Sequence, residues 1–128
     1  MFSIDIMSRQ PVYEQLIAQI EHFVLIGILK PNDKIPSVRS LAVDLSINPN
    51  TIQKAYSELD RRGIIYSVPG RGCFVSEEAN NILSQFKREK LSELEDLVFE
   101  LALANISKEE LIDCINNAYK KKEGMEND

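Results

Sequence analysis

The segment INPNTIQKAY, residues 47–56, constrains the fold most, because a strong helix start is followed at once by a helical pattern of apolar residues. Asn48 is a good N-cap, and the proline after it has a backbone φ suited to a first helical turn. One face of the helix is predicted to be buried, through apolar residues at i, i+3, i+4 and i+7: Ile52, Ala55, Tyr56 and Leu59. The sequence therefore predicts a helix at residues 49–62, ended by Gly63.

Two more helices are predicted before this one. In the first, apolar residues recur at helical spacing from Val12 until Gly27, after a proline suited to a first turn. In the second, Ser37 can cap a short helix whose apolar positions face inward. A short strand is also expected at residues 2–6. The N-terminal half of the chain is thus predicted to be mainly helical.

Residues 64–75 are predicted to form a β-hairpin. Two β-rich runs, residues 64–68 and 73–75, flank the turn PGRG, in which proline and glycine suit the two central positions. Three helices followed by a two-stranded ribbon are the plan of a winged helix-turn-helix domain. In such a domain the third helix enters the DNA major groove, and the ribbon, or wing, reaches along the DNA backbone.

The composition becomes acidic and the pattern helical after residue 76. An apolar seam with 3-4-3 spacing marks one helix, and a capping-box pattern at Ser107 begins a second. Local packing of the seam on another helix of the chain is one interpretation. A homodimer is the preferred one, because a helix pair this small buries too little apolar surface alone. The residues predicted at the dimer interface are Leu91, Leu94, Val98, Leu101, Ile112, Ile115 and Tyr119.

The predicted fold class is therefore mainly α with a small β wing. A winged helix-turn-helix domain is expected at residues 1–76, and a C-terminal two-helix dimerisation tail at residues 77–128. Charge differs between these parts: the whole chain has a net charge of -5, yet residues 34–75 hold six Lys and Arg against three Asp and Glu. Because binding depends on the local field and not on the total charge, this segment can meet a polyanion.

Polar residues in the first turns of the helix at residues 49–62 are predicted to point outward, because the apolar face takes the other side of the cylinder. They are Asn50, Thr51, Gln53 and Lys54. Amides can donate and accept in pairs at a base edge, threonine offers a hydroxyl or a methyl group, and lysine suits phosphate. In the context of the basic hairpin, this combination favours DNA recognition over a helix start alone.

Three motifs occur in order: PSVRSLA at residues 36–42, NPNTIQKAYSEL at residues 48–59 and GRGCFV at residues 70–75. In identity and spacing they resemble the DNA-binding domain of the GntR family of bacterial transcriptional regulators. The resemblance implies DNA contacts from the arginine of the first motif, the first turn of the recognition helix, and the glycine and basic residue of the wing. The full set of predicted DNA-binding residues is Ser37, Arg39, Asn48, Asn50, Thr51, Gln53, Lys54, Gly70 and Arg71.

Most members of this family carry a large effector-binding or aminotransferase-like domain, which residues 77–128 are too few to house. The NPNT motif and the short tail resemble the YtrA subfamily. Members of this subfamily often repress operons for ABC-type transporters and dimerise through the tail. The resemblance implies a dimeric repressor on a two-fold symmetric operator in double-stranded DNA, with half-sites about one helical turn apart. A small-molecule effector acting between tail and head is a further hypothesis, although no residue set marks a ligand pocket.

An enzyme is not expected. The chain has one histidine, His22, no Gly-rich phosphate loop and no carboxylates at catalytic spacing. Cys73 and Cys114 lie far apart without metal spacing, so neither a metal nor a cofactor is expected. The lack of a long apolar run or a signal peptide favours a cytoplasmic protein without a membrane partner. The competing interpretation is a winged-helix protein-interaction module without specific DNA binding.

Overall fold

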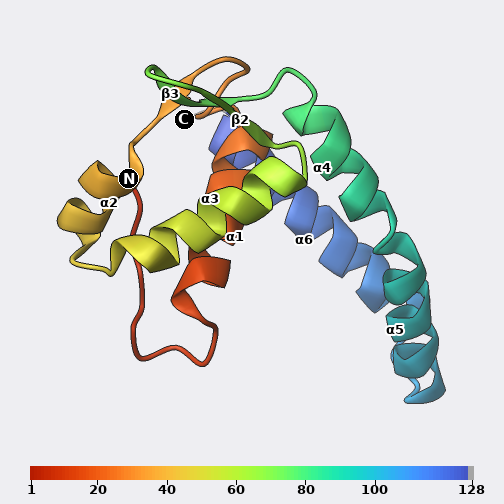
Figure 1. The fold of residues 1–128 in the computed structure, drawn as a ribbon. Helices are drawn as coiled ribbons and strands as arrows, with labels where there is room; N and C mark the ends of the chain where they lie inside the picture. Colours follow the sequence, from red (N-terminus) through yellow and green to blue (C-terminus); the bar gives the residue numbers. More distant parts are fainter. Residues whose placement is uncertain (127–128) are drawn as a thin grey trace. The chain divides into compact units, whose positions relative to one another are not determined.

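The computed structural model describes residues 1–126 and divides at Phe86 into two compact units. The first unit holds α1 (Val12–Leu25), β1 (Lys34–Ile35), α2 (Val38–Leu45), α3 (Pro49–Arg61), β2 (Ile65–Val68), β3 (Gly72–Val75) and most of α4 (Ala79–Arg88) (Figure 1). The second unit continues with α5 (Leu91–Leu103) and α6 (Lys108–Glu126). Helices followed by a small β wing confirm the predicted winged helix-turn-helix class.

The core of the first unit is built around α3, which packs against α1 and α2 and leads directly into β2 (Figure 1). The predicted apolar face of α3 is buried, and consists of Ile52, Ala55, Tyr56 and Leu59. On α1, Leu16 and Ile20 are fully buried in the same cluster. Because burying a Leu or Ile side chain contributes roughly 1.5–3 kcal/mol, this packing decides which side of α3 turns inward.

The predicted N-caps of α2 and α3 form hydrogen bonds with the helix backbone. The Ser37 hydroxyl oxygen accepts from the Ser40 N–H at 3.0 Å, and the Asn48 side-chain oxygen accepts from the Asn50 N–H at 2.8 Å. Proline occupies the first helical position of α3, where no N–H is needed. Gly63, after α3, has a φ of +82°, which a glycine adopts without the strain that a side chain would bring. The start of α3 is therefore set by local sequence.

The wing is an antiparallel sheet in the order β1-β3-β2, so it contains a strand that the sequence did not predict. The hairpin of β2 and β3 agrees with prediction, whereas β1 pairs on the free side of β3 with Ile35 opposite Cys73. At two residues, β1 is too short to show an alternating pattern. The added strand ties the wing to the segment that precedes α2.

The predicted strand at residues 2–6 is wrong, because this segment forms no ladder with the sheet. Side chains of α1 form hydrogen bonds with the backbone of this segment instead. The Ser3 N–H donates to the side-chain oxygen of Gln19 at 3.0 Å, and the Asp5 N–H donates to that of Gln15 at 2.9 Å. Phe2 packs against the core, with its ring edge on Phe23. Residues 2–6 are therefore held on α1 by side-chain hydrogen bonds and not by a neighbouring strand.

Helix α4 was not predicted, and most of it, through Gln85, belongs to the first unit. Ala79 and Leu83 are buried in the core, and a Cβ added to Gly63 would lie 3.0 Å from Cδ1 of Ile82. The division of the structure at Phe86 therefore lies later in the chain than the predicted one after residue 76. The winged domain needs the first two turns of α4 to complete its core.

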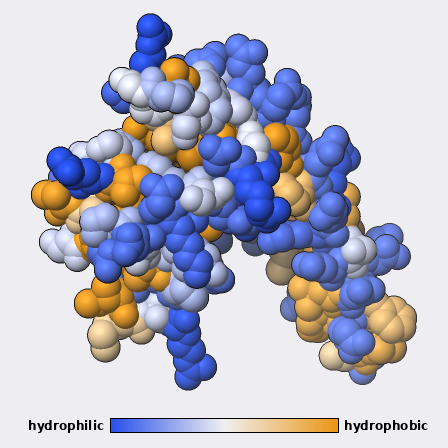
Figure 2. Space-filling view, in the orientation of Figure 1, coloured by the Kyte–Doolittle hydropathy of each residue, from blue (hydrophilic) through white to orange (hydrophobic). Residues whose placement is uncertain are grey.

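The second unit has apolar side chains on its surface (Figure 2). None of the α5 residues is buried, and Val98 and Leu101 are only half-buried. The predicted cap of α6 is present, since the Ser107 hydroxyl accepts from the Glu110 N–H at 3.2 Å. Two amphipathic helices without a buried core gain little stability from their own packing.

Replacing Leu83 by alanine tests whether α4 folds with the winged domain. We expect the free energy of unfolding to fall by about 2–5 kcal/mol, the usual loss for a fully buried leucine. Ser84→Ala, at the exposed neighbouring position, is the control and should change little. Chemical denaturation followed by circular dichroism measures both variants. A Leu83→Ala protein as stable as the control would place α4 outside the cooperative unit.

Candidate nucleic-acid interface

The outward side of α3 carries the polar residues that the sequence assigned to DNA. Asn50, Gln53 and Lys54 are exposed, and Thr51 is half-buried. The Gln53 amide donates to the Ser57 hydroxyl at 3.1 Å, an exposed contact that water or a base edge can replace at little cost. The first two turns of α3 thus present amide donors and acceptors to solvent.

A partly buried hydrogen bond holds α3 in this orientation. The Tyr56 hydroxyl donates to the Pro36 carbonyl at 2.6 Å, which ties the middle of α3 to the segment before α2. Burial, with a smaller contribution from the nearby Cys73, raises the pKa of the Tyr56 phenol well above its usual value, so the hydroxyl keeps its proton as a donor. Because both partners are fixed, α3 cannot roll without breaking a hydrogen bond in a partly buried site.

Gln53 lies on a surface shared by α2, α3 and the wing. A hollow of about 370 Å³ opens there, lined by Gln53 of α3, Val38 of α2, and Ser67 and Cys73 of the wing strands. The three elements that were predicted to contact DNA, namely α2, α3 and the wing, therefore lie next to one another in the fold. Lys54 points elsewhere: its ammonium lies 3.8 Å from the ring centroid of Tyr13 on α1, a cation–π contact.

The N-caps keep donors free for an anionic partner. Ser37 and Asn48 use their side-chain oxygens to accept from the helix N–H groups. The Ser37 hydroxyl proton and the Asn48 amide protons remain available, because a cap uses only an acceptor. Arg39, in the first turn of α2, is exposed. The helix starts therefore offer donors and positive charge together, as phosphate binding requires.

The wing turn has the predicted geometry. The Arg71 N–H donates to the Val68 carbonyl at 2.9 Å, and Gly70 has a φ of +78°, as a type II turn with proline before glycine requires. Arg71 is exposed at the tip. At the base of the wing, Tyr66 and Phe74 stack with ring centroids 5.6 Å apart. A stiff hairpin thus carries one arginine at its end.

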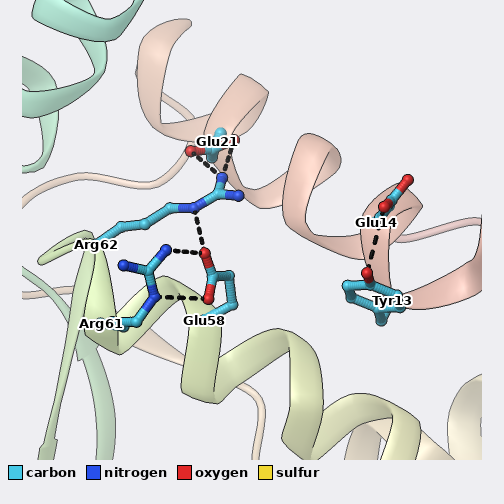
Figure 3. Close-up of polar contacts among 6 residues, drawn as sticks. All are labelled: Tyr13, Glu14, Glu21, Glu58, Arg61 and Arg62. Atoms are coloured by element: carbon cyan, nitrogen blue, oxygen red, sulfur yellow. Dashed lines mark hydrogen bonds and ion pairs between the residues drawn. The ribbon is translucent and has the colours of Figure 1, made fainter.

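Arg61 and Arg62, at the end of α3, belong to an ion-pair network and not to the free basic surface (Figure 3). Both donate to Glu58, Arg61 through Nε at 2.9 Å and Arg62 through Nε at 3.0 Å. Arg62 also reaches Glu21 of α1 at 3.3 Å. Hydrogen bonds from Arg61, then from Arg62, lower the pKa of Glu58 to about 2, so the carboxylate stays charged.

Basic residues between 34 and 75 therefore fall into two groups. Lys54, Arg61 and Arg62 contact Tyr13, Glu58 or Glu21. The others, Lys34, Arg39 and Arg71, make no ion pair with any residue in the described range. These three lie on β1, on α2 and at the wing tip. The sequence counted Lys34 only as a charge, because the strand that carries it was not predicted.

Exposed apolar residues on the second unit include five of those predicted for dimerisation: Leu91, Leu94, Ile112, Ile115 and Tyr119. The other two, Val98 and Leu101, are half-buried. Leu97, Phe99 and Leu103 are also exposed, and the seam did not include them. At 100° per residue, Phe99 and Leu103 lie on the opposite side of α5 from Leu101. The apolar surface is therefore wider than the predicted seam.

Residues 1–126 lack the features of two other kinds of site. No described helix combines the length and apolar character needed to cross a membrane. Within the same residues, no His, Cys, Asp and Glu side chains gather in a group that could hold a metal ion. The polar surface of the first unit thus remains the candidate site.

Comparison with known proteins decides the family. The model of the bacterial regulatory proteins of the gntR family matches residues 12–75, which are the helices and the wing described above. The chain belongs to the GntR family. Family members among its relatives are transcriptional regulators and not enzymes, in agreement with prediction.

Full-length relatives of this GntR-family chain resemble it beyond the winged domain. The HTH-type transcriptional repressor YtrA of Bacillus subtilis is 42% identical over 130 residues and covers both chains completely, which confirms the predicted subfamily. A transcriptional regulator from Oenococcus oeni has a crystal structure with a TM-score of 0.73 and 31% identity, covering 93% of this chain and 99% of that one. The DNA-binding domain of AraR, solved with its operator ORE1, is 32% identical with a TM-score of 0.51, covering 59% and 95%.

The low pKa of Glu58 makes the ion-pair network sensitive to acid. The folded-state pKa of about 2 lies below the ordinary value of 4.5, so Glu58 stabilises the fold above pH 4.5 and loses this contribution as the pH falls toward 2. We therefore expect Glu58→Gln to lower the melting temperature at neutral pH, and the difference from wild type to close between those pH values. Thermal unfolding across pH measures it, with the exposed Glu93→Gln as the control. A difference that is constant with pH would contradict this role.

Proposed function

We propose that this GntR-family protein is a sequence-specific DNA-binding repressor that acts as a homodimer on a two-fold symmetric operator. The observation that carries the proposal is the outward side of α3, whose exposed amides belong to the same domain as the unpaired cations of β1, α2 and the wing tip. The inward side of the same helix is fixed by its buried face and by the Tyr56 hydrogen bond. A rigid helix with free polar groups is what base reading in the major groove needs.

Asn50, Thr51 and Gln53 contact the base edges. A glutamine or asparagine amide pairs with the N6 and N7 edge of adenine, and a threonine methyl group contacts the methyl group of thymine. Gln53 is the strongest candidate of the three, because it also borders the hollow shared with α2 and the wing. Each good bidentate pair is worth about 1–3 kcal/mol against the wrong base.

Phosphate contacts fall to the caps and the free cations. Ser37 and Asn48 keep unused hydrogen-bond donors at the starts of α2 and α3, and Arg39 lies two residues after the first of these caps. At the wing tip, Gly70 has no side chain, so the backbone beside Arg71 can approach DNA closely. Lys54, held over Tyr13, supplies a further cation on the α1 side of α3. These contacts orient the protein on DNA, while the α3 amides choose the sequence.

Repression rests on likeness to the Bacillus subtilis repressor YtrA over the whole length of both chains. The subfamily resemblance extends the proposal to an operon of the transporter type. Dimerisation is supported by the exposed apolar residues of α5 and α6, which a second copy can cover. Two copies place two recognition helices in successive major grooves, about one helical turn of DNA apart.

Selection of sites from a random duplex library tests sequence specificity. We expect the wild-type protein to recover a two-fold symmetric site, Arg39→Ala to lose affinity for all sequences, and Gln53→Ala to relax preference at one base pair of each half-site by about 1–3 kcal/mol. Arg88→Ala and Gln85→Ala, both on exposed positions of α4, are the matched controls. No enrichment at low salt, with a folded protein, would favour the protein-interaction module.

Charged substitutions in the apolar seam test dimerisation. The double variant Leu94→Asp, Val98→Asp should be monomeric, because burying two carboxylates in an apolar interface is costly, and it should bind the operator weakly. Light scattering gives the mass, and a gel-shift titration gives the affinity. Asn117→Asp, at an exposed polar position of α6, is the control. If the double variant stays dimeric, the seam does not belong to the interface.

A further inference from the structure

Lys34 lies on the outer face of the wing sheet. Its register partner on β3 is Phe74, which in turn pairs with Tyr66 of β2. Because side chains alternate along a strand, these three residues share one face of the sheet. The opposite face packs on the core, where Ile35, Ile65 and Val75 are buried. Lys34 therefore lies on the face of the wing sheet that is turned away from the core, and it is exposed there.

Gly72 shows where the lysine chain runs. A Cβ added to Gly72 would lie 3.0 Å from Cε of Lys34 and 3.7 Å from its Nζ. The end of the lysine side chain is thus displaced from its partner Phe74 toward the neighbouring position nearer the wing tip. Gly72 also has a φ of +119°, which side chains rarely adopt. Because Gly72 has no side chain, the Lys34 side chain can occupy the space beside the turn.

Charge on Lys34 is uncompensated. No described residue forms an ion pair with it, in contrast to Arg61 and Arg62, which share Glu58. Lys34 is also exposed. An ammonium on a four-carbon stem is a compact, strongly hydrated charge that binds phosphate as a point contact. Its placement beside the turn that carries Arg71 puts two cations without ion-pair partners on one side of the wing sheet.

We propose that Lys34 is a DNA-phosphate contact of the wing, positioned by the missing side chain of Gly72. The proposal rests on the proposed DNA-binding function and adds a residue to it. Lys34 binds beside the wing turn while Arg71 binds at its tip, so the wing holds the DNA backbone at two points. Neither residue reads a base, and their contribution is equal for all sequences.

Lys34→Met separates charge from packing. Methionine keeps an unbranched apolar chain that can lie across Gly72, and it removes only the ammonium. Each phosphate contact adds about 0.9 to the slope of log affinity against log salt, and a homodimer carries the substitution twice, so Lys34→Met should lower that slope by about 1.8. The affinity ratio of wild type to variant should therefore shrink about twelvefold between 50 and 200 mM salt. Lys34→Arg keeps the charge and should keep the slope.

The comparison uses the full-length protein and the duplex that wild type selects. Lys120→Met, on exposed α6, removes the same charge elsewhere and is the control for net charge. Gly72→Ala displaces the lysine chain, so it should lower the slope as Lys34→Met does, and the double variant should lower it no further. Melting temperatures are measured for every variant. A Lys34→Arg protein with a wild-type slope excludes a fold defect as the cause.

A Lys34→Met protein with wild-type affinity and slope overturns the inference while leaving the proposed function intact. An equal fall in slope for Lys120→Met also overturns it, since net charge alone would then explain the effect. Absence of any specific binding by wild type is the failure of the proposed function, and it is seen before the variants are compared. A slope reduced by Lys34→Met and restored by Lys34→Arg supports the phosphate contact.

Discussion

Burial of one face of α3 is the constraint on which the rest of the structure depends. Ile52 and Leu59 have no exposed surface, and the Tyr56 hydroxyl is bound to a carbonyl outside the helix. A rotation by one residue, about 100°, would bury amides without partners and expose these side chains, at a cost of several kcal/mol. The outward direction of Gln53 follows from that geometry. The same packing that stabilises the domain therefore also aims its polar surface.

Local signals explain how much of this could be predicted from sequence. The caps at Ser37 and Asn48 and the turn around Gly70 depend on neighbours within three residues, and each has the predicted hydrogen bond. Strand β1 and helix α4 escaped prediction because distant partners stabilise them: β3 for the strand, and the core for Leu83. Residues 2–6 have the pattern of a strand, but α1 side chains took the hydrogen bonds that a neighbouring strand would have made.

Ion-pair partners, one on α3 itself and one on α1, decide which cations are free. Composition gives residues 34–75 an excess of positive charge, but it does not show that Glu58 and Glu21 neutralise the end of α3. Once those pairs are known, the uncompensated charge lies on β1, α2 and the wing. A cation already bound to a carboxylate must exchange one anion for another to reach DNA, so it gains less. The net charge of -5 is thus compatible with a basic surface on the winged domain.

The second unit buries too little apolar surface to be stable by its own packing. Leu94 remains 47% exposed and Phe99 61% exposed, although burying each would contribute roughly 1.5–3 kcal/mol. Phe99 and Leu103 lie on the side of α5 opposite Leu101, so one flat partner cannot cover both sides. A second copy whose own helices surround α5 can cover both. Under the proposed function, dimerisation would then order the tail and fix the spacing of the two recognition helices in a single step, so that a seam variant loses both together.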